Sequence, residues 1–459
     1  MSNSSLLLAS LDHCSLDPVG CQEFICTGAI YEDRTIYKEV RKIGPATVAR
    51  FSAGELKSEQ RYWRITDVAP ESMDGQEAVA KVWEQLVSAA EKVGRIYERP
   101  VCDLTGGYDS RALVAAFLAA GVPISTTVTG PDDNLDVIVS KGLAELTNLP
   151  HIHLKSEKLI TFRQVEETLH FTEGEFNMVE YVRILNVHRH LSETFDISIN
   201  GSFGGVSRGW RWELLFPRIG AKNKLDASKL ASLRYVPKSC DSCIFPQEIK
   251  LDFRTHFADA IERINTGLSG LPNTVQMDHA NLLMRIRCWQ GGIANSTNRL
   301  WPCLSPFGLR SVLEAVLQTK FSLRLRSLLI RQMLSQYQPK LAEFPLDRGY
   351  PAMPVSVKNL YLFWPVPIYF GKSIASKIVR LIRSGSDLQR DRLPARRYLW
   401  NDEEVKEVLH PDRMRLESII DKVAVADFLE RSRNEKFNHD EQWERLLSLE
   451  LVMRVLEKV

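Results

Sequence analysis

The chain has 459 residues, enough for two or three domains with a sizeable core. Its hydrophobic share of 44% and charged share of 25% are those of a globular protein, which excludes a disordered or fibrous chain. The net charge of +2 gives no reason to expect nucleic acid or an anionic membrane as a partner. No stretch has the roughly 18 apolar residues of a transmembrane helix. The nearest, residues 360–370, is predicted to be buried, with surface association as the alternative.

The N-terminus has no basic start and too short an apolar run for a signal peptide. Among the eight cysteines, Cys240 and Cys243 form a Cys-x-x-Cys motif that has no second pair at zinc spacing. A zinc site is therefore the less favoured interpretation of this motif. Reduced cysteines and a cytoplasmic location are the simplest expectation.

Residues 1–75 contain short apolar stretches broken by polar turns, a pattern more typical of strands than of helices. We therefore expect a short β-rich N-terminal segment. Residues 75–93 then carry apolar side chains at helical spacing, which predicts the first long helix.

Residues 101–111 combine an apolar strand, a tight turn and a helix. The strand candidate ends at Leu104, the turn is Thr105-Gly106-Gly107, and the helix candidate spans 110–120. Adjacent glycines let the backbone approach a ligand closely, and the N-terminus of the helix favours an anion there. An acid beside that anion, Asp109, makes sense if a divalent cation, most simply Mg²⁺, lies between them. The alternative is a turn that binds nothing.

Further strands are predicted at 124–128, 151–154 and 196–199, with a helix at 134–146. Strands that alternate with helices indicate an α/β fold in which a parallel sheet has helices on both faces. Ligands of such sheets bind at the carboxyl ends of the strands, so the loops at 105–110 and 128–133 are expected on one edge.

The C-terminal part is predicted to be largely helical. Helices are predicted from residue 282 onward and at 309–317. An amphipathic helix whose arginines form a solvated face is predicted at 323–334. Residues 384–396 are expected to form an exposed loop. Residues 428–459 read as a helix pair with an apolar stripe in the core.

The run from Leu104 to Ser110 resembles the Ser-Gly-Gly-x-Asp-Ser pyrophosphate loop of the ATP-pyrophosphatase superfamily. More narrowly, it is similar to the synthetase domain of the asparagine synthetase family, which includes β-lactam synthetases and lasso-peptide cyclases. Thr105 keeps the hydroxyl of the family's serine. The resemblance implies an adenine nucleotide α-hydrolase-like fold, ATP and Mg²⁺ as cofactors, and Asp109 as the metal ligand. The nucleotide contacts that it implies are Leu104, Thr105, Gly106, Gly107, Asp109, Ser110, Val128, Thr129, Gly130, Asn200 and Gly201.

Residues 34–45 and 61–63 resemble the family's junction between an N-terminal glutaminase and the synthetase. We therefore interpret 1–75 as the vestigial end of a glutaminase domain with its junction, and 76–459 as the ATP-binding synthetase domain. The family's glutaminase uses an N-terminal cysteine, whereas this chain has Ser2, and Cys14 is its first cysteine. Glutamine hydrolysis is expected to be absent, so nitrogen would come from ammonia, an amine or a separate glutaminase.

Two departures from the family pattern bear on catalysis. Residues 200–210 resemble its Ser-Gly-x-Gly-x-Asp-Glu loop, but Gly204-Gly205 stand where the two acids belong. The family's catalytic lysine aligns with Asp347. The adjacent Arg348 is the expected stand-in, and Lys358 is a weaker candidate. Residues 290–298 are either a hydrogen-bonded turn or part of the acceptor pocket.

The resemblance implies an ATP-dependent amide-forming ligase. A small-molecule, sugar or peptide carboxylate would be activated as an acyl-adenylate with release of pyrophosphate, and ammonia or an amine would then displace AMP. Arg348 and Asp109 are the expected catalytic residues. One alternative is a catalytically impaired relative that binds a nucleotide or a partner protein. Another is an enzyme that adenylates a different oxygen, such as a nucleobase carbonyl.

Overall fold

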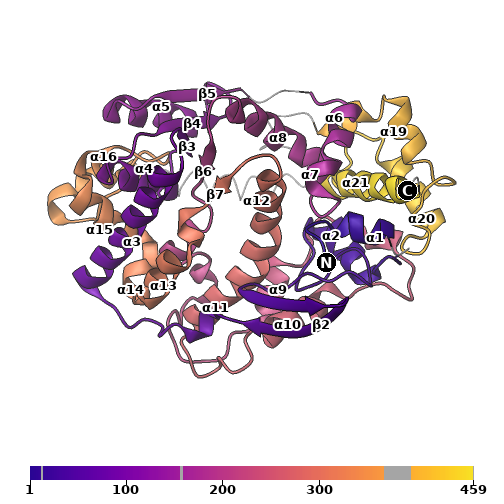
Figure 1. Cartoon of the computed structure of the whole chain (residues 1–459), viewed down its shortest axis with the longest axis horizontal. Helices are drawn as coiled ribbons and strands as arrows, with labels where there is room; N and C mark the ends of the chain where they lie inside the picture. Colours follow the sequence, from indigo (N-terminus) through magenta and orange to yellow (C-terminus); the bar gives the residue numbers. More distant parts are fainter. Residues whose placement is uncertain (12–13, 156–158, 366–393, 458–459) are drawn as a thin grey trace.

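The computed structural model describes residues 1–11, 14–155, 159–365 and 394–457. Its central feature is a five-stranded sheet in which every neighbouring pair of strands is parallel. The strand order across the sheet is β5-β4-β3-β6-β7 (Figure 1). The predicted α/β class with a parallel sheet is therefore confirmed. The strands are β3 (Pro100–Asp103), β4 (Ser125–Thr129), β5 (His151–Leu154), β6 (Ile197–Ile199) and β7 (Cys303–Leu304).

Helices cover both faces of this sheet, as predicted. Successive strand residues point to opposite faces, and accordingly Val101 and Cys102 of β3 enter two different cores. Cys102 packs with the apolar residues of α3, α4 and α5, whereas Val101 packs with Leu191 of α8 and with Trp301. These helices are α3 (Gly75–Ile96), α4 (Asp109–Ala119), α5 (Leu135–Thr147) and α8 (Met178–Ser192).

The order of the strands reverses at β3. After β3 the chain adds β4 and β5 on one side, and it then returns to add β6 and β7 on the other side. The loops that leave β3 and β6 lie side by side at this point, where Gly201 and Gly204 of the β6 loop pack against the start of α4. Open α/β sheets bind their ligands in the crevice at this reversal point, beyond the carboxyl ends of the two strands.

The predicted strand, turn and helix at 101–120 form. The helix α4 follows the glycine turn, and Gly121 beyond its end has a φ of 65°, which its missing Cβ allows. Predicted helices at 75–93, 134–146 and 309–317 also form near their expected bounds. The other helices that surround the sheet are η1 (Ile65–Asp67), η2 (Gly204–Arg208), η6 (Pro306–Gly308), α13 (Arg310–Gln318), α14 (Phe321–Arg324), η7 (Leu325–Ser327), α15 (Leu328–Tyr337), α16 (Pro339–Glu343) and η8 (Val357–Phe363).

The helix expected at 323–334 is broken, and its arginines are not a common solvated face. The chain kinks at Arg326, whose φ is 55°, so that α14 and α15 are separate helices. Arg324 is buried, where Nη2 donates to Asp278 Oδ2 (2.6 Å) and Nε to the Val206 carbonyl (3.0 Å). Helical spacing alone did not reveal this buried ion pair.

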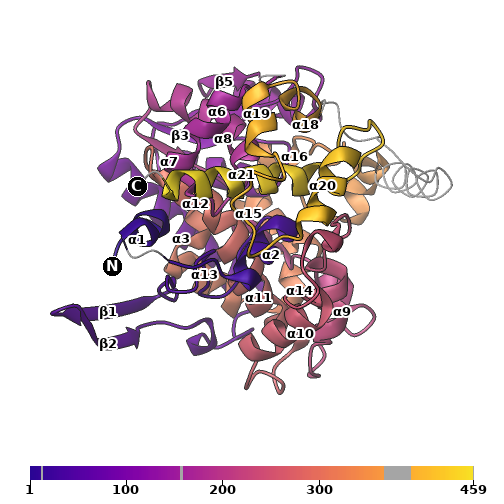
Figure 2. The ribbon, with the colours of Figure 1, turned by 90° about the vertical axis from the view of Figure 1, so that its right-hand side faces the viewer.

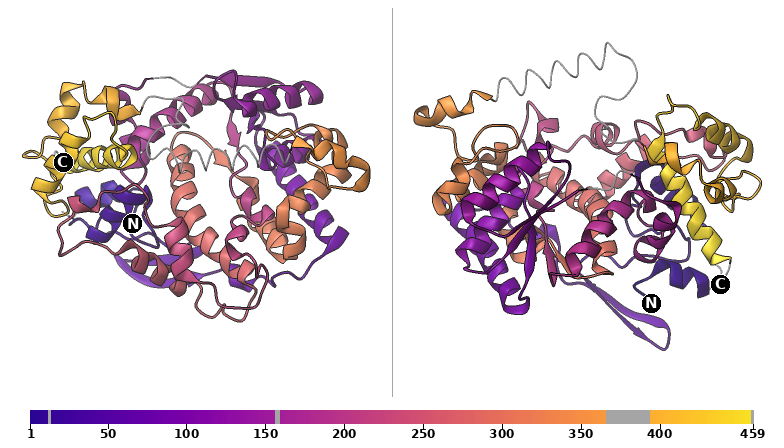
Figure 3. Two further views of the ribbon diagram at one scale, coloured as in Figure 1. Left: turned by 180° about the vertical axis from the view of Figure 1, so that it is seen from behind. Right: turned by 90° about the horizontal axis from the view of Figure 1, so that it is seen from above.

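A second core lies beside the sheet and combines helices from both ends of the chain (Figures 1 and 3). Phe24 of α2 packs there with Leu446 of α21. The two termini lie near each other (Figure 2). The helices of this part are α1 (Ser5–Leu11), α2 (Pro18–Thr27), α6 (Phe162–Glu167), α7 (Leu169–Thr172), η3 (Trp212–Leu215), α9 (Ala227–Arg234), η4 (Ser242–Ile244), α10 (Phe253–Ile264), α11 (Asn273–Ala280), η5 (Asn281–Gln290), α12 (Gly291–Asn298), α18 (Ala395–Leu399), α19 (Glu403–Val408), α20 (Lys422–Arg431) and α21 (Asp440–Leu456).

The expectation of a β-rich N-terminus is wrong for its first part, because α1 and α2 are helices. Residues 20–26 of α2 are all buried, so this helix lacks the amphipathic period by which a surface helix is recognised. The later part does contain strands. The antiparallel pair β1 (Thr47–Ser52) and β2 (Glu55–Arg61) projects from the body of the molecule (Figure 2).

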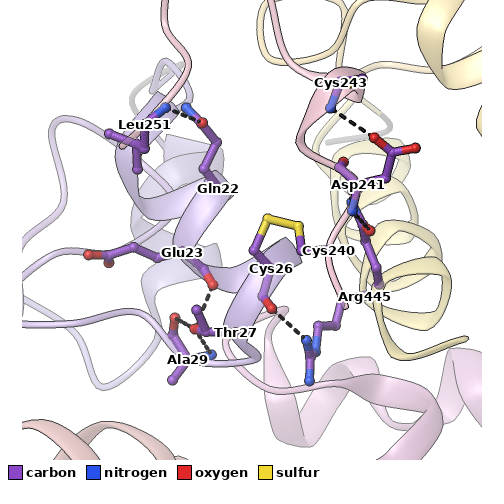
Figure 4. Close-up of a disulfide and its surroundings, with 11 residues drawn as sticks. Gln22, Glu23, Cys26, Thr27, Ala29, Cys240, Asp241, Cys243, Leu251 and Arg445 are labelled. Atoms are coloured by element: carbon purple, nitrogen blue, oxygen red, sulfur yellow. Dashed lines mark hydrogen bonds between the residues drawn. A yellow bond between two sulfur atoms is a disulfide. The ribbon is translucent and has the colours of Figure 1, made fainter. Parts of the chain in front are cut away.

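A disulfide joins Cys26 of α2 to Cys240, 214 residues further along the chain (Figure 4). Arg445 of α21 donates from Nη1 to the Cys26 carbonyl (3.2 Å), so the link lies among the helices of the second core. Reduced cysteines were therefore the wrong expectation for this pair. Cys243, the other cysteine of the Cys-x-x-Cys motif, is exposed and takes no part in this disulfide.

Residues 360–370 were predicted to be buried, which is wrong for most of the described part. Leu360, Tyr361 and Trp364 are exposed, whereas Phe363 is buried. Residues 366–370 lie outside the described part, as do 384–393 of the expected exposed loop. Among the described helices, none is long and apolar enough to cross a bilayer.

Candidate functional site

A cavity of about 370 Å³ lies at the reversal point, between the loops that follow β3 and β6. The predicted glycine turn forms one wall, and the loop after β6 forms another. A third wall comes from the segment 346–348, far along the chain. The lining residues are Asp103, Thr105, Gly107, Tyr108, Asp109, Ser110, Asn200, Gly201, Ser202, Arg208, Leu346, Asp347 and Arg348.

Hydrogen bonds within the chain hold the glycine turn in shape. The Thr105 N–H donates to Ser110 Oγ (3.0 Å), and the Gly107 N–H donates to Thr105 Oγ1 (3.3 Å). The Gly106 N–H donates to Asp136 Oδ1 of α5 (2.8 Å). A carboxylate oxygen therefore already accepts from one turn amide, which shows that the turn suits an anion. A phosphate that used the same amide would have to displace Asp136.

Asp109, the expected metal ligand, forms a two-bond ion pair with Arg208 of η2. Arg208 Nε donates to Oδ1 and Nη2 donates to Oδ2, both at 2.7 Å. Burial raises the pKa of Asp109, and the adjacent guanidinium opposes that rise. The pair is therefore a charge-assisted contact in a partly enclosed site, with both carboxylate oxygens engaged.

The backbone of the β6 loop packs directly against Asp109. A Cβ added to Gly204 would lie 2.5 Å from Asp109 Cγ, which is far inside van der Waals contact. A Cβ added to Gly201 would lie 3.0 Å from the Ser110 nitrogen. Close approach to the start of α4 thus leaves no room for a side chain at position 204 and little room for one at position 201.

The Mg²⁺ that the resemblance implies does not fit these residues as they stand. Both oxygens of Asp109 accept from Arg208, and no carboxylate side chain fits at position 204 beside them. A divalent cation needs several oxygen ligands and is repelled by an adjacent guanidinium. Within the described part of the chain, no group of three His, Cys, Asp or Glu side chains is arranged to hold a metal ion.

The segment around Arg348 does reach the glycine turn. The Asp347 N–H donates to the Gly106 carbonyl (3.2 Å), and Arg348 lines the cavity. Burial raises the pKa of Asp347, and Arg348 opposes that rise. Arg348 and the glycine turn, both expected at the nucleotide site, thus border one cavity.

Arg111 explains how the segment is held, although the sequence analysis assigned it no role. It is fully buried in the first turns of α4. Its guanidinium donates to the carbonyls of Leu341 (2.9 Å), Phe344 (2.5 Å) and Pro345 (2.9 Å). Burial lowers the pKa of Arg111 to about 10. The same helix thus positions the glycine turn at its start and the 346–348 wall through this side chain.

Asp103 lines the cavity, although the sequence analysis assigned it no role. It is the last residue of β3, and burial raises the pKa of its carboxyl to about 7. Asn200, across the cavity at the end of β6, is fixed by its neighbours: Ser202 N–H and Ser305 Oγ donate to its Oδ1. The acidic end of an otherwise apolar strand was the signal that could have identified Asp103.

Other expected contacts lie outside the cavity wall. Leu104 is buried beneath the turn, and Gly106 backs onto Asp347. Residues Val128, Thr129 and Gly130 stand at the end of the neighbouring strand β4 and do not border the described cavity. Lys358 is exposed on η8, away from the cavity.

Residues 290–298 are helical rather than a hydrogen-bonded turn. They form the end of η5 and the helix α12. Asn298 at the end of α12 accepts from the Cys303 N–H (2.9 Å) and so fixes the start of β7. These residues do not line the cavity at the reversal point.

A scan against models of protein families finds no match to the chain, and a search of curated proteins finds no relative. The family resemblance therefore remains a prediction based on the sequence motifs.

Proposed function

We propose that the cavity binds the phosphates of ATP and that the protein is an AMP-forming carbon–nitrogen ligase. One observation carries this proposal: a Gly-Gly turn and the start of a helix open into a cavity at the sheet's reversal point, where two guanidinium groups also line the wall. Backbone amides, hydroxyls and guanidinium groups are the donors that phosphate oxygens accept. The resemblance of 104–110 to a pyrophosphate loop supports the same ligand.

The proposed reaction overcomes a leaving-group problem. A carboxylate does not react with an amine at neutral pH because oxide would have to leave. The carboxylate oxygen instead attacks the α-phosphorus of ATP, the bond to the β-phosphate oxygen breaks, and pyrophosphate leaves. The amine nitrogen then attacks the acyl carbon, AMP departs with the electrons of the acyl–oxygen bond, and the nitrogen releases a proton to water. The protein positions the groups and balances the charge that develops.

The roles of the chain's own residues follow from their positions. Thr105 and Ser110 would offer hydroxyls to the departing pyrophosphate, and Arg348 would balance charge on the reacting phosphate. The acceptor would be a small-molecule, sugar or peptide carboxylate, and the nitrogen would come from ammonia, an amine or a separate glutaminase. Because ATP is the expected substrate, we propose a cytoplasmic enzyme.

The first test is titration calorimetry with ATP, using two matched glycine variants. Gly107→Ala adds a methyl group at ordinary contact distance, 3.4 Å from Thr105 Oγ1, at the point where phosphate would approach. Gly270→Ala adds the same group where nothing lies within 4 Å. We expect Gly107→Ala to weaken ATP binding by about tenfold, the cost of one blocked hydrogen bond to a charged group. Gly270→Ala should bind like the wild type.

Pyrophosphate release from ATP, measured across a panel of carboxylic acids with ammonium present, then tests the ligase chemistry. Release that depends on one class of acid identifies the acceptor. ATP binding without release for any acid would favour the nucleotide- or partner-binding alternative, for which the Asp109–Arg208 pair is the motivating observation. If the folded protein binds no ATP at millimolar concentration, the proposed function is wrong.

A further inference from the structure

The reaction outlined above counts Arg208 only as one of two guanidinium groups in the cavity wall, yet this side chain makes a two-bond contact there. Its guanidinium meets Asp109 edge to edge through Nε and Nη2. A guanidinium has five N–H groups, and this pair uses two of them. The side chain keeps 29% of its surface exposed and lines the cavity. The remaining N–H groups are thus available to a ligand at that wall.

We infer that Arg208 takes the place of a divalent cation, so that this site binds nucleotide phosphates as the metal-free anion. The inference rests on the proposed nucleotide site and adds the ionic form of the ligand. An acid beside a phosphate site is repelled by the ligand unless a cation lies between them. Here the cation is part of the chain, and its planar fork suits a carboxylate on one side and phosphate oxygens on the other.

The packing of Gly204 supports this substitution. A side chain at position 204 would occupy the space of the Asp109 carboxyl group, because its Cβ would lie 2.8 Å from Oδ1 and 2.5 Å from Cγ. Glycine lets the loop carrying Arg208 approach α4 closely enough for both hydrogen bonds. The absence of an acid at position 204 and the ion pair of Arg208 with Asp109 are therefore structurally linked.

Charge balance then predicts which form of the ligand binds. The Asp109–Arg208 pair is neutral overall, so free pyrophosphate or ATP meets no net repulsion from it. A chelated Mg²⁺ would bring a second cation toward Arg208 while finding both Asp109 oxygens occupied. The site should prefer the free anion to its magnesium chelate.

Titration calorimetry with sodium pyrophosphate and with ATP tests the inference, each in excess EDTA and again in excess MgCl₂. We expect binding in EDTA, and weaker binding by about threefold or more when Mg²⁺ is present. In EDTA, Arg208→Gln should reduce the affinity by at least about tenfold, as expected for a lost hydrogen bond to a charged group. Arg211→Gln is the matched control. Arg211 is nearby and half-buried but packs over Trp210 (5.0 Å) and does not line the cavity.

The outcomes separate this inference from the proposed function. Binding that requires Mg²⁺, or unchanged binding in EDTA by folded Arg208→Gln, would overturn the inference and leave the nucleotide site intact. No binding of either ligand under any condition would instead remove the proposed function. If Arg208→Gln fails to fold, Arg208→Lys takes over the test. It keeps the charge without the two-bond geometry, so it should bind more weakly than the wild type, and equal affinity would count against the inference.

Discussion

Asp103 shows how burial sets the charge of a single residue in the cavity. Burial at the end of β3 raises the pKa of its carboxyl to about 7. Near pH 6 the group is mostly protonated, and it neither repels a phosphate nor needs a counter-ion. As the pH rises through 7 the group ionises and adds a negative charge to the wall.

We therefore expect pyrophosphate affinity to fall as the pH rises from 6 to 8, beyond any change in the ligand's own ionisation. In Asp103→Asn the uncharged amide cannot ionise, so this extra fall should disappear. At pH 8 the variant should bind more tightly than the wild type, by about tenfold for one removed like charge. Calorimetry of both proteins at pH 6, 7 and 8 measures the difference. Parallel pH profiles would show that Asp103 does not influence the ligand.

The residues of the glycine turn were predictable because they are contiguous and their chemistry depends on local backbone shape. The Asp109–Arg208 pair was not, since the two residues are 99 positions apart and meet through the strand order. The absence of acids at 204–205 pointed to a missing cation ligand. The structure adds that an arginine in the same loop meets the remaining acid.

At the scale of elements, the alternating strands and helices were predictable from short-range periodicity. The sheet edge that carries the site followed from parallel pairing. Two of the elements that were missed show the reason. The helix α2 is buried all round and gives no amphipathic signal, and the helix at 323–334 breaks at a residue with positive φ that no glycine or proline marks. Both depend on packing partners distant in sequence.

The link between α4 and the 346–348 wall depends on the buried Arg111. Its three donated hydrogen bonds end on carbonyl groups of a segment that carries Arg348 into the cavity. Without the guanidinium these carbonyls would lose their partners in a buried place. The wall should then shift even though the glycine turn stays intact.

Arg111→Met should therefore lower the free energy of unfolding by on the order of 3 kcal/mol, the cost of leaving buried carbonyls unsatisfied. Urea denaturation followed by circular dichroism measures this loss. Arg95→Met is the control, because Arg95 lies in the last turn of α3 with 77% of its side chain exposed. If both variants lose the same free energy of unfolding, the buried hydrogen bonds of Arg111 do not stabilise the fold more than an exposed arginine does.

At the scale of the whole molecule, stability depends on carboxyl groups buried in the second core as well as on the site. Glu444 of α21 is half-buried in the wall of a pocket, and burial raises its pKa from 4.5 to about 7. Asn177 donates from Nδ2 to its Oε2 (3.0 Å), while Glu180 and Glu441 face it with like charge and Arg445 with opposite charge. The folded protein thus holds a proton that the unfolded chain releases above about pH 4.5.

The sign of the resulting pH dependence follows from this difference. Because the pKa of this carboxyl group is raised in the folded protein, its proton contributes fully to stability below pH 4.5. This contribution is lost progressively as the pH rises to about 7.

Glu444→Gln removes the ionisable group but keeps an oxygen for Asn177. The variant should therefore gain stability over the wild type between pH 5 and pH 8, by on the order of 2 kcal/mol. Because the two proteins are compared at each pH, the contributions of the other titrating groups, which both proteins share, cancel. Urea unfolding at pH 5 and pH 8 measures the gain, with the partly exposed Glu91→Gln as control. If the free energies of unfolding of the wild type and Glu444→Gln differ by the same amount at pH 5 and pH 8, Glu444 is already ionised in the folded protein. The folded protein would then hold no extra proton at this carboxyl group, and the group would not make stability depend on pH in this range.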